Sequence, residues 1–124
     1  MEDIVFVCLD EIIKRGFDGV LLDRVDAYEY WEEKGVLDAR QMMLDFVLEI
    51  SDRAKEGRCL LVIPQNAEEL LENPVYLGKI DGMSSEDVWT FEEDRPLEEV
   101  EQRLNLLDKV ISTGKLVLVL DYPV

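Results

Sequence analysis

Apolar positions along the chain follow two patterns, one with helical spacing and one of short continuous runs. Val5, Cys8, Leu9 and Ile12 recur three or four positions apart, and similar stripes follow later. These stripes predict helices over residues 3–15, 37–56 and 97–113 and a short helix over 67–72, broken by Asn73 and Pro74. Apolar runs between polar ends predict strands near 19–23, 60–64, 80–83 and 116–121.

The order of these elements indicates the fold class. Each predicted strand is preceded or followed by a helix, and this alternation is typical of βαβ units in a parallel sheet. The segment from Arg24 to Gly35 is aromatic and acidic without clear periodicity, so we expect a long loop there. The 124 residues suit a single α/β domain over residues 1–124 with four parallel strands.

Composition narrows the chemistry that the chain can perform. The 13 Lys and Arg residues stand against 29 Asp and Glu, which gives a formal charge of -16, and there is no His. This acidic balance argues against a nucleic acid or an anionic membrane surface as partner, because both attract positive charge. Without His, a Ser-His-Asp or Cys-His triad and the His-bearing zinc sites are excluded, so acid–base chemistry must use carboxylates.

Two further features concern redox state and location. Cys8 and Cys59 lie among apolar neighbours without metal-ligand spacing, so we expect buried free thiols. No signal peptide or membrane span is visible in the sequence. We therefore expect a cytoplasmic protein, or an extracellular one if an upstream export signal has been removed.

Polar residues stand at the end of every predicted strand. Asp23 follows the first strand, Gln65 and Asn66 the second, Glu86 comes shortly after the third, and Asp121 follows the fourth. The carboxyl ends of parallel strands meet at one edge, where ligands bind, so these residues are predicted to share a pocket. The other interpretation is that they cap the following helices. Their carboxylates could also bind a hard cation, but no loop has calcium-binding spacing, so we expect no metal and no cofactor.

Aromatic residues accompany the same strand ends. Tyr28, Tyr30 and Trp31 follow the first strand, Trp89 the third and Tyr122 the fourth. Rings beside carboxylates suit a sugar, whose C–H faces stack on them while its hydroxyls form hydrogen bonds. The alternative is that the rings cover the end of the core, and for Tyr28, Trp31 and Tyr122 both interpretations stay open.

Four stretches at these strand ends resemble glycoside hydrolase family 114, the endo-α-1,4-polygalactosaminidases and related TIM-barrel proteins. The stretches are Gly16–Tyr28 (GFDGVLLDRVDAY), Val62–Asn66 (VIPQN), Ile80–Asp87 (IDGMSSED) and Val119–Tyr122 (VLDY). They occur in the family's order and span essentially the whole chain. The resemblance implies a (β/α)8 barrel that hydrolyses a galactosamine-containing polysaccharide with two carboxyl groups.

The resemblance also implies which residues act. Carried over position by position, the motif residue Asp23 and the acidic residue Glu86 form the catalytic pair. One carboxylic acid protonates the leaving oxygen, and the other is the nucleophile or activates water. We assign Glu86 as acid/base and Asp23 as its partner, although the sequence does not distinguish the two roles. The substrate-binding residues expected around them are Asp26, Tyr28, Gln65, Asn66, Asp121 and Tyr122.

The chain has about half the length that this fold needs. A TIM barrel typically takes roughly 250 residues. The resemblance of the motifs implies that the four strands here correspond to the fourth to seventh of the barrel. Four open strands leave two edges unpaired and one face uncovered. We therefore expect a fragment, a homodimer that completes the barrel, or an open sheet without activity. The predicted function is a glycosidase if the barrel is completed. The alternative is a non-catalytic half-barrel that binds carbohydrate or a partner protein, or is inactive.

Overall fold

The computed structural model describes residues 2–57, 60–91 and 93–122. Its helices are α1 (Glu2–Lys14), α2 (Tyr28–Glu33), α3 (Ala39–Gly57), α4 (Pro74–Lys79) and α5 (Leu97–Ser112). Its strands are β1 (Gly19–Leu22), β2 (Leu61–Pro64), β3 (Gly82–Glu86), β4 (Thr90–Phe91), β5 (Glu93–Asp94) and β6 (Leu116–Leu120). Two 3-10 turns, η1 (Val25–Ala27) and η2 (Glu68–Glu72), follow β1 and β2.

The four long strands are parallel and neighbour one another in the order β1-β2-β3-β6. β1 pairs with β2, and β3 pairs with β6, each over its full length. An isolated parallel bridge between Gln65 and Ser84 links the two pairs, and the Asp81 N–H donates to the Val62 carbonyl at 2.9 Å. The predicted parallel sheet is therefore confirmed. The antiparallel pair β4–β5 is a small separate ribbon.

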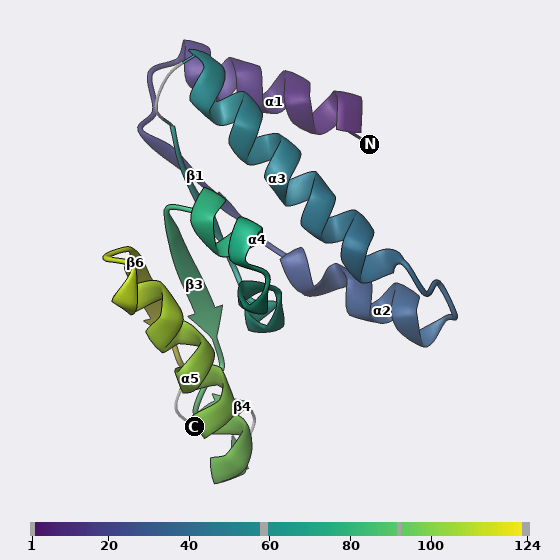
Figure 1. Cartoon of the computed structure of the whole chain (residues 1–124), viewed down its shortest axis with the longest axis vertical. Coiled ribbons are helices and arrows are strands. Elements are labelled where there is room, and N and C mark those ends of the chain that lie inside the picture. The colour runs from purple at the N-terminus through teal and green to yellow at the C-terminus, as the bar shows by residue number, and fades with distance from the viewer. Residues whose placement is uncertain (1, 58–59, 92, 123–124) are drawn as a thin grey trace.

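One face of the strands packs against the helices. Val62 and Met83 are fully buried, and they join apolar residues of the helices in two clusters. In Figure 1 the chain runs from α1 and α3 at one end to α5 at the other, with the strands between them. Every second side chain of a strand points to the same face of the sheet. On this face, side chains such as those of Val20 and Leu22 pack against the helices.

The opposite face, which we call the inner face, is apolar and open to solvent. Its leucines are 42% to 53% exposed: Leu21, Leu61, Leu116, Leu118 and Leu120. Gly19 and Gly82 lie on the same face of their strands as these leucines. A Cβ on Gly19 would lie 2.9 Å from the Leu61 Cβ, and a Cβ on Gly82 would lie 2.8 Å from the Leu116 carbonyl oxygen. Neighbouring strands thus approach each other too closely at these two positions for any side chain.

Three local predictions are corrected by the structure. The segment predicted as a loop over Arg24–Gly35 contains η1 and α2, because Val25 and Tyr28 are buried and anchor it to the core. The short helix predicted over 67–72 forms as the 3-10 turn η2 and ends at Asn73 as predicted, but a new helix, α4, begins there as well. The Asn73 Oδ1 accepts hydrogen bonds from the N–H groups of Val75 (2.9 Å) and Tyr76 (3.2 Å) and so caps α4.

The third correction concerns the strand expected over residues 80–83, which lies at Gly82–Glu86. Two serines, Ser84 and Ser85, are buried within it. Of the two cysteines, Cys8 is exposed rather than buried, and Cys59 lies outside the described residues. No described helix is both long and apolar enough to span a membrane.

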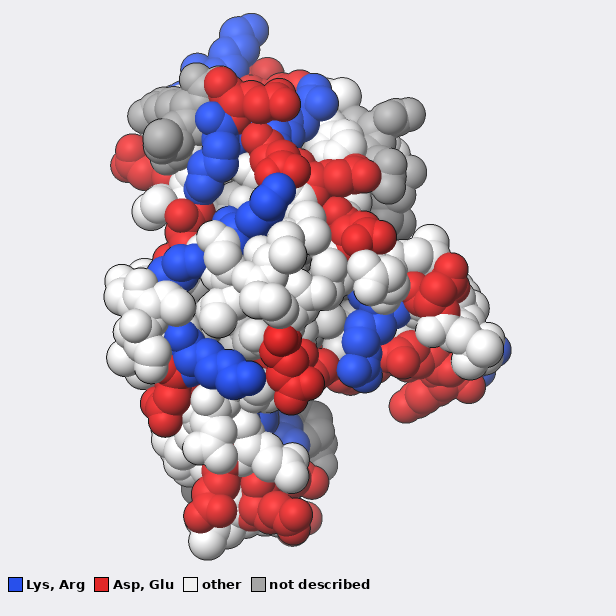
Figure 2. Space-filling model, in the orientation of Figure 1, with Lys and Arg blue, Asp and Glu red and all other residues white. Residues whose placement is uncertain are grey.

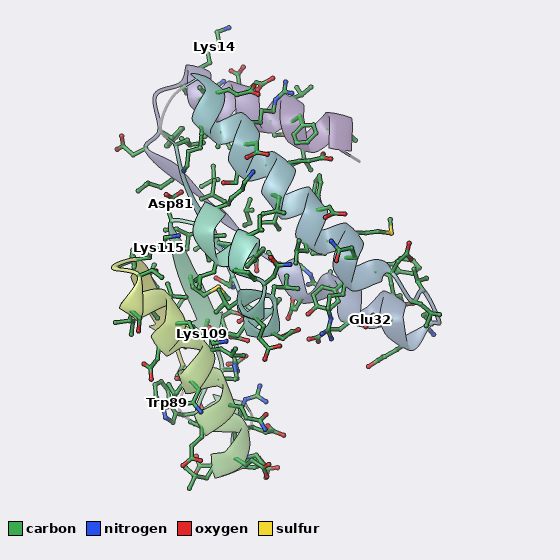
Figure 3. All side chains as sticks on the ribbon, in the orientation of Figure 1. Lys14, Glu32, Asp81, Trp89, Lys109 and Lys115 are labelled. Carbon is green, nitrogen blue, oxygen red and sulfur yellow. The ribbon has the colours of Figure 1, made fainter. Side chains whose placement is uncertain are left out.

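Ion pairs cover the amino ends of the strands. Asp81 accepts from Lys55 and from the Val62 N–H, Lys79 pairs with Asp52, and Lys115 donates to the Leu77 carbonyl at 2.5 Å. Figure 3 shows Asp81 and Lys115 at this end of β3 and Trp89 beyond the other end. Acidic and basic side chains are interspersed over the face seen in Figure 2.

Candidate active site

An acidic cleft of about 470 Å3 lies at the carboxyl ends of the strands. The loops after β1 and β2, the end of β3 and the residues leading into and along α5 form its walls. Its lining residues are Asp26, Glu29, Asn66, Ala67, Glu68, Glu69, Glu86, Asp87, Arg95 and Arg103. Two of the residues predicted at strand ends, Asn66 and Glu86, line this cleft, whereas Asp23, Gln65 and Asp121 are not among its lining residues.

Side chains join three strand ends beside this cleft. The Asp23 Oδ1 accepts from the Gln65 Nε2 at 3.1 Å and from the Arg24 N–H at 2.8 Å. The Ser84 Oγ donates to the Gln65 Oε1 at 3.3 Å. Both ends of the Gln65 amide are thus occupied, and this side chain fixes the orientation of the Asp23 carboxylate.

Glu86 is held through its backbone. Its N–H donates to the Asn66 Oδ1 at 2.9 Å, and its carbonyl accepts from the Arg103 Nη2 at 2.8 Å. No described residue donates a hydrogen bond to the Glu86 carboxylate, which belongs to a half-buried residue on the cleft wall. Its carboxyl group can therefore turn toward a ligand.

The backbone turns sharply after each of the first three long strands. Arg24, Asn66, Ala67 and Asp87 have positive φ values of 62°, 65°, 58° and 53°. Non-glycine residues rarely adopt this left-handed conformation, and each such residue costs about 1–3 kcal/mol unless its surroundings compensate. All four lie at the carboxyl ends of the strands, and two of them, Arg24 and Asp87, directly follow Asp23 and Glu86.

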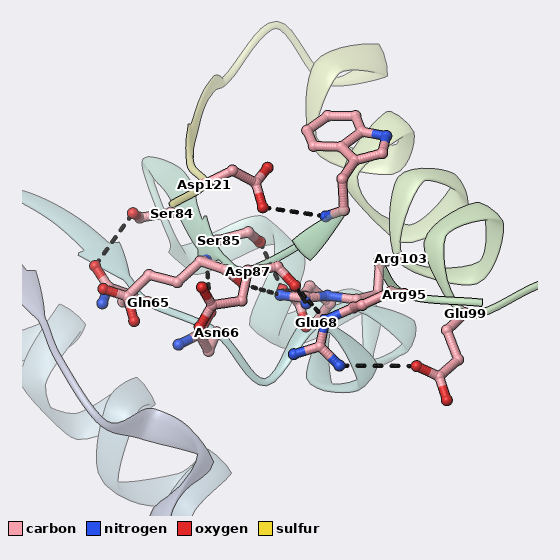
Figure 4. Close-up of polar contacts among 12 residues, drawn as sticks. Gln65, Asn66, Glu68, Ser84, Ser85, Asp87, Arg95, Glu99, Arg103 and Asp121 are labelled. Atoms are coloured by element: carbon pink, nitrogen blue, oxygen red, sulfur yellow. Dashed lines mark hydrogen bonds and ion pairs between the residues drawn. The ribbon is translucent and has the colours of Figure 1, made fainter. Parts of the chain in front are cut away.

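A buried ion pair supports the wall of the cleft. The Arg103 Nη2 and Nε donate to the Glu68 Oε1 at 2.6 Å and 3.2 Å, and the Ser85 Oγ donates to the same oxygen at 2.6 Å. The Arg103 Nη1 donates to the Asp87 carbonyl at 2.8 Å. Figure 4 shows Glu68, Asp87, Arg95 and Arg103 gathered at one point.

Three further acidic residues on the cleft wall affect one another's charge: Asp26, Glu29 and Glu69. Partial burial, and then the nearby Glu69 charge, raise the pKa of Glu29 to about 7. Burial also raises the pKa of Asp26 above its usual value. Carboxyl groups that hold protons near neutral pH are typical of sites that perform acid–base chemistry.

The aromatic predictions have mixed outcomes. Tyr28 is only 2% exposed, its ring belongs to the core, and its hydroxyl donates to Glu69, so the expected sugar contact is corrected. Trp31 is exposed but lines a separate apolar groove of about 440 Å3 between α2 and α3. Tyr122 is exposed beyond β6, and its sugar contact stays a prediction.

The polar residues expected to bind substrate already contact protein groups. Gln65 is buried and connects Asp23 to Ser84, and Asn66 supports Glu86. The Asp121 Oδ1 accepts from the N–H groups of Trp89 (3.1 Å) and Thr90 (3.4 Å), which lie after β3 and in β4 rather than at the start of a helix. Their further contact with substrate stays a prediction. Among the described residues, no cluster of three or more acidic or Cys side chains is arranged to hold a metal ion.

Sequence reasoning missed several residues of the cleft. Glu29, Glu68 and Glu69 lie within seven positions of a strand end, so a wider window after each strand would have included them. Arg103 lies in the middle of α5, far from any strand end in the sequence. No local signal distinguishes it from a surface residue.

The chain belongs to glycoside-hydrolase family GH114, whose sequence model matches residues 2–124. An uncharacterized protein of Methanocaldococcus jannaschii is 42% identical, covering 96% of this chain and 37% of that protein. An uncharacterized protein of Thermotoga maritima is 37% identical, and the match covers 98% of this chain and 40% of that protein. The chain thus spans about two fifths of the length of these curated relatives.

The glycoside hydrolase domain of PelA from Pseudomonas aeruginosa has a similar fold. It superimposes with a TM-score of 0.76 at 18% identity, covering 98% of this chain and 49% of that domain. A glutamate-to-alanine variant of the same domain matches with a TM-score of 0.77. The four parallel strands and their helices therefore correspond to about half of a (β/α)8 barrel.

Proposed function

We propose that this chain supplies the catalytic edge of a glycosidase, with Asp23 and Glu86 as its two carboxylates. The observation that carries the proposal is that both residues end parallel strands linked through Gln65 and Ser84. Two strand spacings of about 4.8 Å and two residues of rise put their Cα atoms about 12 Å apart. If both side chains turn toward each other, we expect their carboxyl groups to lie within about 5–10 Å, the range that glycosidase geometries cover.

The surroundings of the two carboxylates support different roles. The two donors on the Asp23 Oδ1 hold that carboxylate in one orientation, as a nucleophile or a water-activating base requires. The Glu86 carboxylate has no such donor among the described residues and can rotate toward the glycosidic oxygen. We therefore keep Glu86 as the acid/base and Asp23 as its partner.

The charge of the cleft supports a cationic amino sugar as substrate. Asp26, Glu29 and Glu69 line one side, and an ammonium group pairs with carboxylates through charge-assisted hydrogen bonds. Burial, together with the nearby Glu69 charge, raises the pKa values of Asp26 and Glu29, and a bound ammonium group would favour their charged forms. A galactosamine polymer would supply the missing positive charge.

The test is a substrate panel for the 124-residue protein, read as new reducing ends. The panel contains an α-1,4-galactosamine polymer, its fully N-acetylated form and a neutral galactan. We expect the fastest cleavage of the galactosamine polymer and slower cleavage of the acetylated form, which lacks the ammonium group. Cleavage of none of the three would overturn the proposed activity, and equal cleavage of all three would overturn the amino-sugar preference.

We also infer that a second copy of the chain covers the inner face. The exposed leucines of β1, β2 and β6 form an apolar surface on that face. Within the described residues, β1 and β6 each pair with one strand only, so both carry unpaired backbone groups on their outer edges. Two such sheets related by a two-fold axis would give eight parallel strands, the number in a closed barrel.

A further inference from the structure

We propose that Arg103 is a positioning residue for Glu86, acting through the backbone at the end of β3. This inference rests on the proposed role of Glu86. The Arg103 guanidinium donates to the carbonyls of both Glu86 and Asp87 at 2.8 Å. It therefore holds the two consecutive peptide groups that follow Glu86, and the first of them is bonded to the Cα from which the Glu86 side chain leaves the strand.

The guanidinium is itself fixed by a buried partner. Glu68 has a side chain only 8% exposed and accepts from Arg103 and from Ser85 through one oxygen. A buried carboxylate needs such a partner, because an isolated charge inside a protein is strongly unfavourable. The planar fork of Arg spreads its donors over three nitrogens, which here reach a carboxylate and two carbonyls at once. The three donors of Lys share one nitrogen and do not span the same set of acceptors.

The backbone at this point needs external support. Asp87 has a φ of 53°, and such a conformation persists only where the surroundings fix it. Its N–H donates to the Leu120 carbonyl at 2.9 Å, and its own carbonyl accepts from Arg103 and Arg95. Together with the Asn66 bond to the Glu86 N–H, these contacts make the end of β3 rigid.

Amide hydrogen exchange measured by NMR on the full chain tests this role without any substrate. In the double variant Arg103→Met/Glu68→Gln, no charge is left buried without a partner. We expect the Glu86 and Asp87 amides to exchange about tenfold faster than in the wild type, because opening the end of β3 no longer breaks the hydrogen bonds from Arg103. The exchange rate of the Val62 amide should not change. The matched control Arg53→Met/Asp10→Asn removes a two-bond Arg–carboxylate pair on the surface and should leave all three amides unchanged.

Arg103→Lys separates positioning from simple ion pairing. Lys retains a charge for Glu68 but cannot also hold both carbonyls, so we expect faster exchange at Glu86 and Asp87 with little loss of thermal stability. Wild-type exchange at these two amides in Arg103→Lys and in the double variant would overturn the proposal.

Hydrolysis provides a second readout. A misplaced acid slows the chemical step, so we expect Arg103→Lys to lower kcat about tenfold to hundredfold with little change in KM. An unchanged kcat would overturn the positioning role in catalysis. If the wild-type protein does not cleave the polymer, the proposed activity fails, and the exchange measurement alone decides whether Arg103 positions Glu86.

Discussion

Carboxylates at the two ends of the parallel strands have different electrostatic surroundings. At the amino end, Asp81 and Asp52 are paired with lysines, and Asp81 also accepts from the backbone of β2. At the carboxyl end, Asp26 and Glu29 have raised pKa values because burial and neighbouring carboxylates disfavour their charge.

This difference separates groups that stabilise the fold from groups available for chemistry. A paired carboxylate adds to stability, whereas crowded carboxylates around an open cleft cost stability and gain reactivity. Glu68 is the exception at the carboxyl end, since Arg103 neutralises it inside the fold. It therefore belongs to the support of the site rather than to its reactive surface.

The largest effect expected from this comparison is on hydrolysis. Glu86→Gln and Asp23→Asn should each lower kcat roughly 10²- to 10⁴-fold, because each removes one of the two carboxyl groups that the reaction needs. Neither change should alter the thermal unfolding midpoint greatly. The control is Asp81→Ala at the other end of the strands, which should keep kcat. Full activity in either strand-end variant removes that residue from the mechanism.

The next effect is on stability and belongs to the amino end. Asp81→Ala leaves the fully buried Val62 N–H without its side-chain acceptor and Lys55 without its partner. We expect a loss of about 1–3 kcal/mol in the free energy of unfolding, measured by urea denaturation. A loss no larger than that of a surface substitution would show that water replaces these contacts.

A smaller effect is expected on association. The charge of -16 opposes contact between two copies, so self-association through the inner face should tighten between about 0.01 M and about 1 M salt. Sedimentation velocity can follow this change. Leu118→Asp on the inner face should abolish it, whereas Leu37→Asp, at a position already 92% exposed, should not. A monomer at both salt concentrations would contradict the second-copy proposal.

The smallest effect is the pH dependence contributed by Glu29. Its pKa is about 7 in the fold against an ordinary value of 4.5, so between these pH values the folded state holds a proton that the unfolded state has lost. Stability from this group is therefore present below about pH 4.5 and is lost as pH rises through about 7. Glu29→Gln should remove this part of the decline in thermal stability, and Glu33→Gln on the same helix is the control.

Elements with strong apolar patterning could be predicted almost to the residue. β1, β2 and β6 are continuous apolar runs whose helix-facing side chains need burial, and their order along the chain gives the parallel sheet. β3 was predicted two residues too early because Ser84 and Ser85 do not resemble core residues. Their hydroxyls are satisfied by Gln65 and Glu68, contacts made only in the folded chain.

The site could be predicted only where it depends on strand ends. Asp23, Asn66 and Glu86 follow from the positions of the strand ends, and the last two line the cleft. Asp26, which also lines the cleft, was indicated only by the resemblance to the family. The Glu68–Arg103 pair joins positions 35 apart, so only the packing of α5 against the loop after β2 creates it. The burial of Tyr28 likewise depends on α3 and the core, and its local sequence is equally compatible with an exposed ring.

The central claim is that carbohydrate binds at the carboxyl end of the strands and not at the amino end. NMR titration of the 124-residue protein with a short α-1,4-galactosamine oligosaccharide tests this directly, and it does so whether or not the protein cleaves the sugar. We expect the largest shifts at the amides of Asn66, Glu86 and Asp87, with Val62 and Asp81 unchanged. Shifts centred on Val62 and Asp81, or no shifts at a saturating concentration, would contradict the account.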